Sequence, residues 1–147
     1  MEININFPAV AVCVLISFVL SFLWYTVLYT VLFMKPWITE MGYDPNMRPD
    51  IKGMMKGMGV SLVGNFLFVW VLAFYLAGWK YFPNSAEMST SSFAINSALS
   101  VWLGFIVPIH LSKVAWERHS WKLFFINSGY NLVSAIVVAL ILAHWTN

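Results

Sequence analysis

The sequence predicts an all-α fold, a bundle of four transmembrane helices that forms a single membrane domain over residues 1–147. Hydrophobic residues make up 61% of the chain and charged residues only 10%, against roughly 25% charged residues in soluble proteins. Four stretches contain no Asp, Glu, Lys or Arg, over residues 3–34, 57–79, 88–112 and 123–147. Each exceeds the ~20 residues that a helix needs to cross the hydrocarbon core, where backbone amides must be bonded internally.

We expect the spans to cover residues 7–33, 57–79, 92–113 and 121–145, with a short amphipathic cytoplasmic helix start before the second span. Pro8 suits a first helical turn, where its missing N–H has no partner in any case. Asp50 and Ser120 can cap the second and fourth spans. Pro108 leaves the carbonyl of Gly104 without its usual donor, which predicts a kink in the third span.

The basic residues predict the orientation. Seven basic residues lie in the loops that follow spans one and three, namely Lys35, Arg48, Lys52, Lys56, Lys113, Arg118 and Lys122. The loop between spans two and three contains only Lys80. The more basic loops of a membrane protein face the cytoplasm. Both termini are therefore expected on the non-cytoplasmic side of the membrane.

Small and polar residues recur at four-residue steps in every span. The four stripes are Cys13, Ser17, Ser21 and Tyr25; Gly53, Gly57, Ser61 and Asn65; Asn96, Ser100, Gly104 and Pro108; and Asn127, Asn131, Ala135, Ala139 and Ala143. Small residues let helices approach closely in lipid, and polar side chains there bond to neighbouring helices. These faces predict helix contacts within the bundle and between copies, and therefore a homo-oligomer.

Tyr25, Asn65, Asn127 and Asn131 fall at similar depth in the cytoplasmic half of their spans. An amide in hydrocarbon needs a hydrogen-bond partner, so Asn65 is expected to bond across the bundle. We expect the four residues to form a polar pocket open to the cytoplasm. The asparagines either contact a solute or ion or only hold the helices together, and the sequence leaves both interpretations open.

The charged turn between the third and fourth spans marks the expected rim of this pocket. His110, Glu117 and Arg118 lie at that end of the bundle. Long basic side chains at such a position reach the lipid headgroups, so anchoring at the membrane surface explains most of this turn. Membrane lipids are accordingly the expected partners.

The sequence predicts no catalytic residues, metal ligands or cofactor. It contains no Ser/His/Asp order, metal-ligand spacing or phosphate-binding loop. Six of the eight methionines lie between residues 34 and 58, where thioethers could bind Cu(I), but an amphipathic helix start also explains them. All six carboxylates lie outside the spans, which argues against proton-coupled export. Too few charges exist to form a basic face for nucleic acid.

Two signatures carry a resemblance to a known family. They are Leu23-Trp24-Tyr25 leading to Lys35-Pro36-Trp37, and Trp116-Glu117-Arg118 leading to Leu123-Phe124-Phe125-Ile126-Asn127-Ser128-Gly129-Tyr130. With these motifs the chain resembles, over nearly its whole length, the bacterial and fungal membrane proteins of domain-of-unknown-function family 1761. The resemblance implies a multi-span membrane fold, with a bacterial cytoplasmic (inner) membrane as the expected location, and assigns no activity.

The sequence therefore favours a non-enzymatic integral membrane protein that binds or lets permeate a small polar solute or ion. The alternative is a non-catalytic interaction or assembly subunit of a membrane complex, in which the polar stripes only hold helices together. A third possibility is a lipid-modifying enzyme, with Glu117, His119 and Tyr25 in acid–base roles on a lipid headgroup.

Overall fold

The computed structural model describes residues 5–25, 41–42, 44, 50–79, 81 and 87–145 of the chain. Over these residues the regular structure is entirely helical, which confirms the predicted all-α fold. The helices are α1 (Phe7–Leu23), α3 (Ile51–Trp79), α4 (Thr90–Val101), η3 (Trp102–Ile106), α5 (Val107–Trp116) and α6 (Trp121–Trp145). The segments α4, η3 and α5 follow one another without a break and form the third of four rods.

Three of these rods are long and apolar enough to cross a membrane. They cover Ile51–Gly78, Thr90–Trp116 and Trp121–Trp145, and α1 is a shorter apolar helix of 17 residues. The protein is therefore an integral membrane protein. The predicted second span, 57–79, lies inside α3, which begins at Ile51, so the expected amphipathic start and the span form one continuous helix.

Side-chain caps explain where the helices begin. Ser120 Oγ accepts the N–H of Leu123 at 3.2 Å, and Asp50 Oδ1 accepts the N–H of Lys52 at 3.2 Å, which confirms both predicted caps. Asn6 and Ser89 do the same for α1 and α4. These caps satisfy amide groups that a helix start leaves without a partner in the helix.

A π-helical turn, η3, interrupts the third rod. The N–H of Val107 donates to the carbonyl of Trp102, five residues earlier. Pro108 follows at the start of α5 and has no N–H to donate, so a wider turn before it costs little. Where the sequence predicted a kink at Pro108, the structure has a π turn directly before it, which changes the helical phase before His110.

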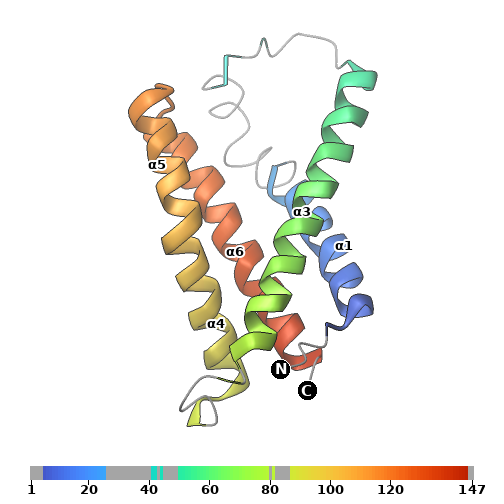
Figure 1. The fold of residues 1–147 in the computed structure, drawn as a ribbon. Coiled ribbons are helices and arrows are strands. Elements are labelled where there is room, and N and C mark those ends of the chain that lie inside the picture. The colour runs from blue at the N-terminus through green and yellow to red at the C-terminus, as the bar shows by residue number, and fades with distance from the viewer. Residues whose placement is uncertain are drawn as a thin grey trace.

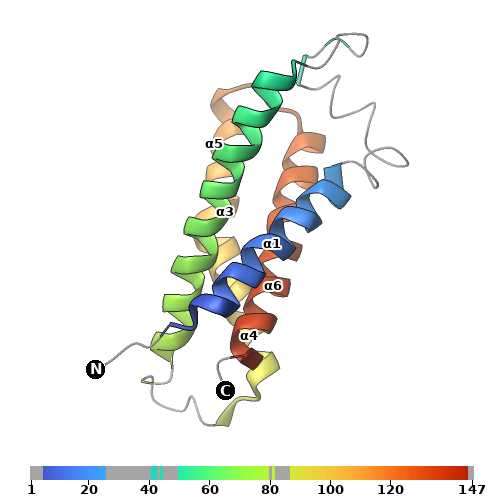
Figure 2. The ribbon, with the colours of Figure 1, turned by 90° about the vertical axis from the view of Figure 1, so that its right-hand side faces the viewer.

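The rods alternate in direction, and α6 is the element that joins the bundle (Figure 1). It packs against α1, α3, α4 and α5, and its most extensive contact is with α4. The start of α1, the end of α3, the start of α4 and the end of α6 share one end of the bundle (Figures 1 and 2). The opposite end holds the starts of α3 and α6 and the end of α5 (Figure 1).

The core occupies the half of the bundle where α1 begins and α6 ends. Alanines let the helices approach there, with Ala94 and Ala98 on α4 and Ala135 and Ala139 on α6 all fully buried. Cys13 on α1 belongs to the same cluster and is fully buried, as predicted. In the other half the helices diverge, and α3 leans away from α5 (Figure 1).

This divergence decides which of the predicted stripes face protein. On α1 and α6 the stripes point inward, where Ser17 and Ala143, for example, are buried. On α3 the first half is exposed, and a Cβ on Gly57 would meet no atom within 4 Å. Among the residues that the structure describes, no helix lies against that half of α3, so the close helix approach predicted there is not formed within this part of the chain. The third stripe, from Asn96 to Pro108, is also exposed.

Some of the predicted features lie outside the described residues. They are residues 26–33 of the first span and the basic residues Lys35, Arg48 and Lys80. The basic residues that are described lie at the starts of α3 and α6, at the end of α5 and in the turn after α5, namely Lys52, Lys56, Lys122, Lys113 and Arg118. They share one end of the bundle (Figure 1).

Candidate functional site

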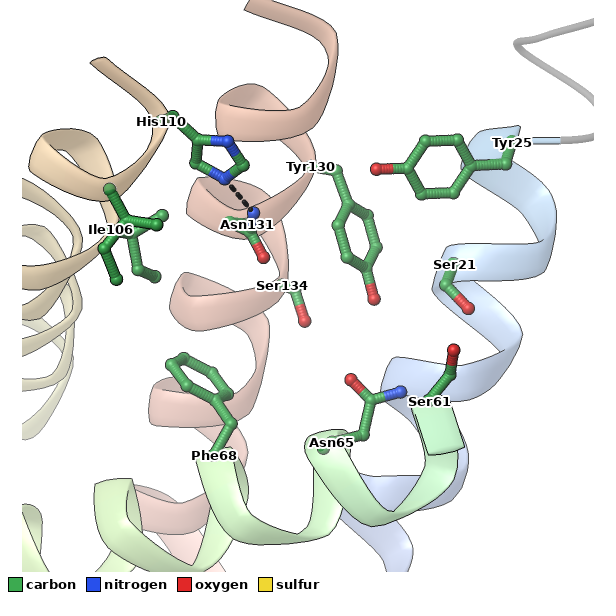
Figure 3. Close-up of a pocket in the computed structure, with 12 residues that line it drawn as sticks. Ser21, Tyr25, Ser61, Asn65, Phe68, Ile106, His110, Tyr130, Asn131 and Ser134 are labelled. Atoms are coloured by element: carbon green, nitrogen blue, oxygen red, sulfur yellow. Dashed lines mark hydrogen bonds between the residues drawn. The ribbon is translucent and has the colours of Figure 1, made fainter. Parts of the chain in front are cut away.

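A cavity of about 470 Å³ lies between α1, α3, α6 and the junction of η3 with α5 (Figure 3). It occupies the diverging half of the bundle, beyond the alanine-lined core. Its lining residues are Ser21, Tyr25, Ser61, Gly64, Asn65, Phe68, Ile106, Ile109, His110, Tyr130, Asn131 and Ser134. Eight of these twelve residues have a hydroxyl, carboxamide or imidazole group, and none of the twelve is Asp, Glu, Lys or Arg.

The structure brings together most of the residues that the sequence singled out. Tyr25, Asn65, Asn131 and His110 line the cavity. Asn127 lies one turn before Asn131 on α6, and its Oδ1 accepts the hydroxyl of Tyr25 at 2.9 Å. The remaining two predicted residues, Glu117 and Arg118, lie in the exposed turn after α5 and are not among the lining residues.

The carboxamide of Asn131 is held in one orientation. Its Nδ2 donates to the backbone carbonyl of Asn127 at 2.9 Å and lies 3.0 Å from Nε2 of His110. A carbonyl can only accept, so the atom that faces it must be the amide nitrogen. With one amide hydrogen on that carbonyl, the second points at His110, whose Nε2 must accept it. This arrangement fixes His110 as the neutral tautomer with its proton on Nδ1.

This orientation of the Asn131 carboxamide leaves its oxygen, Oδ1, facing the cavity. Figure 3 shows Oδ1 turned away from His110 and toward the open space in front of Ser134. The π turn before α5 contributes to this pairing, because it sets the phase at which His110 leaves the helix. A fixed hydrogen-bond acceptor therefore faces the cavity from α6.

Asn65 supplies the second carboxamide, from the opposite wall. It lies on α3, is half-buried, and its side chain points toward the cavity (Figure 3). No hydrogen bond joins Asn65 to any other residue that the structure describes, so the bond expected across the bundle is not formed within this part of the chain. The amide nitrogen and the amide oxygen of Asn65 both point toward the cavity (Figure 3).

Two tyrosines connect the cavity to α1. The hydroxyl of Tyr130 donates to the buried backbone carbonyl of Ser17 at 3.2 Å, and the rings of Tyr25 and Tyr130 lie 5.3 Å apart. Tyr130, Ser134 and Ser21 were not among the predicted site residues. The available signal was helical spacing, since Tyr130 follows Asn127 by three residues and Ser134 follows Asn131 by three.

Aromatic side chains fix the polar segment of α6 from both sides. Trp24 Nε1 donates to the carbonyl of Ile126 at 3.2 Å, and Trp102 Nε1 donates to the carbonyl of Ser128 at 2.8 Å. These carbonyls already lie within the helix, so each tryptophan adds a bond between helices in the apolar part of the bundle. The wall that carries Asn131 is therefore rigidly placed between α1 and the third rod.

The charged turn forms a separate feature. His119 Nε2 lies 3.6 Å from Glu117 Oε2, and both side chains are at least partly exposed. Arg118 has a left-handed backbone with φ of 56°, and the N–H groups of Glu117 and His119 both donate to the carbonyl of Lys113. The turn closes the C-terminus of α5 in the manner of a left-handed helix cap.

The cavity offers neutral hydrogen-bonding groups and an apolar wall. Within the described residues no group of three His, Cys, Asp or Glu side chains could hold a metal ion. Phe68, Ile106 and Ile109 form the apolar part of the lining. Such a combination suits a ligand with one polar edge and an apolar body, because pockets of this size commonly orient ligands with a few polar groups.

The model of a protein family described as "Protein of unknown function (DUF1761)" matches residues 8–143, nearly the whole chain. No curated protein and no solved structure gives a significant match.

Proposed function

Because the chain belongs to DUF1761, a family described only as proteins of unknown function, we propose a function from the geometry of the cavity alone. The protein binds, or lets permeate, a small polar solute or ion in the cavity between α1, α3, α5 and α6. It catalyses no reaction on that ligand and needs no cofactor.

One observation carries the proposal: polar side chains from three helices converge on one cavity. Asn65 and Ser61 come from α3, Ser21 from α1 with Tyr25 just beyond its end, and Asn131 and Ser134 from α6. Polar groups in a bilayer are costly unless they find partners. Residues that only hold helices together would bond to one another, whereas Asn65 bonds to no described residue.

We also propose an orientation and a location for the site. The described basic residues lie at the end of the bundle where α3 and α6 begin, and the positive-inside rule puts that end in the cytoplasm. The cavity lies in the same half of the bundle, so it opens toward the cytoplasm. The membrane is then the bacterial cytoplasmic membrane, with Arg118 and Lys122 at its lipid headgroups.

A homo-oligomer is part of the same proposal. The stripe of Asn96, Ser100 and Gly104 faces away from the single chain. Polar and small residues on an outward face of a membrane helix are better satisfied against a second copy than against lipid. The subunit count of the purified protein tests this point, and a monomer would contradict it.

Native mass spectrometry of the purified full chain tests the binding proposal. We expect a small molecule to accompany the wild-type protein and to be lost from Asn131→Leu. The control is Tyr75→Phe, which removes a hydroxyl from an exposed side chain of α3 that lies outside the cavity and outside the proposed interface between copies. This variant should keep the bound molecule.

The same mass spectra can instead favour the alternative function, an assembly subunit of a membrane complex. If the wild-type protein carries no small molecule, or if Asn131→Leu keeps it, the cavity does not bind a ligand. The polar residues would then serve only to hold the helices together, as expected of an assembly subunit in a membrane complex.

A further inference from the structure

The two carboxamides of the cavity are not equivalent, and their difference restricts the ligand. Both hydrogens of Asn131 are used within the protein, on the carbonyl of Asn127 and on His110. Asn131 therefore presents only an acceptor, its Oδ1. Asn65, on the facing wall, presents both a donor and an acceptor. A matching ligand donates toward α6 and both donates and accepts toward α3.

The charge of the lining adds a second restriction. None of the twelve lining residues is Asp, Glu, Lys or Arg, and the bond from Asn131 keeps His110 neutral. An ion that entered would give up its hydration without meeting an opposite charge, which is costly in a low-dielectric interior. An uncharged ligand gives up only hydrogen bonds to water, which the carboxamides and hydroxyls can replace.

The apolar part of the lining and the volume of the cavity indicate the size of the ligand. Phe68 on α3 and Ile106 and Ile109 on the third rod line the cavity, and Figure 3 shows Phe68 and Ile106 on the side away from Tyr25 and Ser21. A volume of about 470 Å³ exceeds what a molecule of a few atoms fills, and it lies in the range typical of pockets for larger ligands. The space therefore suits a polar head with an apolar body.

We infer that the cavity selects an uncharged carboxamide with an apolar body. The N–H groups of its amide donate to Oδ1 of Asn131 and to Asn65, its carbonyl accepts from Asn65, and its apolar part packs against Phe68 and the two isoleucines. This inference rests on the proposed function and narrows its ligand from any small polar solute or ion to one chemical class.

Three probes of one shape test the inference. Benzamide is neutral, benzamidine is its cationic counterpart at neutral pH, and benzoate is the anionic one. Binding of each to the full chain in lipid nanodiscs is measured by saturation-transfer difference NMR, with empty nanodiscs to subtract partition into lipid. We expect benzamide to bind at least about tenfold more tightly than either charged probe.

Variants connect the binding to the cavity. Asn131→Leu should weaken benzamide binding about tenfold or more, and Tyr75→Phe, which changes an exposed side chain of α3 outside the cavity, should leave it unchanged. Asn65→Leu provides a second cavity variant that breaks no hydrogen bond between described residues, so a folding defect of Asn131→Leu would not leave the question open.

The outcomes separate this inference from the proposed function. If benzamidine or benzoate binds as tightly as benzamide and the cavity variants abolish that binding, the inference is overturned while the cavity remains a binding site. If none of the three probes binds, or if neither cavity variant weakens benzamide binding, the inference is also overturned. The co-purified molecule in native mass spectra then decides the proposed function independently.

Discussion

The two cavity asparagines should respond differently to the same substitution, Asn→Leu. In Asn131→Leu the protein loses the bonds from Nδ2 to the Asn127 carbonyl and to His110. Hydrogen bonds between side chains in membrane proteins contribute ~0.6 kcal/mol on average, and His110 is also left without its partner. We expect the free energy of unfolding to fall by about 1–2 kcal/mol.

Asn65→Leu removes no hydrogen bond between described residues and replaces an amide with an apolar group of similar size. We expect the free energy of unfolding to stay the same or to rise by up to about 1 kcal/mol. Yet both substitutions should abolish ligand binding, because both remove polar groups from the cavity. A residue whose loss stabilises the protein and removes its binding serves function rather than folding.

Unfolding of the purified protein by SDS in mixed micelles measures both free energies, and Tyr75→Phe serves as the control on an exposed part of α3 outside the cavity. If Asn65→Leu lowers the free energy of unfolding as much as Asn131→Leu does, Asn65 holds the helices together and our interpretation of the cavity is refuted.

Three other predictions follow from single features of the structure. Pro108→Ala restores an N–H that can donate to the carbonyl of Gly104, one α-helical turn back. This removes the reason for the π turn and rotates His110 away from Asn131. Benzamide binding should therefore weaken severalfold in the NMR titration. Arg118 has a left-handed backbone, with φ of 56°, which glycine adopts without strain. Arg118→Gly should therefore raise the free energy of unfolding by up to about 1 kcal/mol in the SDS assay. A clear loss of stability would instead assign the Arg118 side chain a role at the headgroups. Cys13 is fully buried, so a thiol reagent should modify it only after unfolding in SDS, and rapid labelling of the native protein followed by mass spectrometry would contradict the described core.

The sequence determined the class of the protein and its helices. Hydropathy and charge-free length are properties of each segment alone, and in a bilayer the backbone can satisfy its amides only within a helix. Caps such as Ser120 were predictable for the same reason, because they act on their own helix. The four-residue steps also predicted correctly that the stripes of α1 and α6 face protein.

Tertiary structure alone decided which of these polar residues meet. Whether a stripe lies against a neighbour depends on how the rods tilt, and the sequence of α3 contains nothing that specifies its divergence from α5. The π turn sets the pairing of His110 with Asn131, and a change of one residue in helical phase cannot be derived from residue spacing. The free carboxamide of Asn65 likewise follows from the distance between helices, which the packing of the alanine core at the other end of the bundle determines.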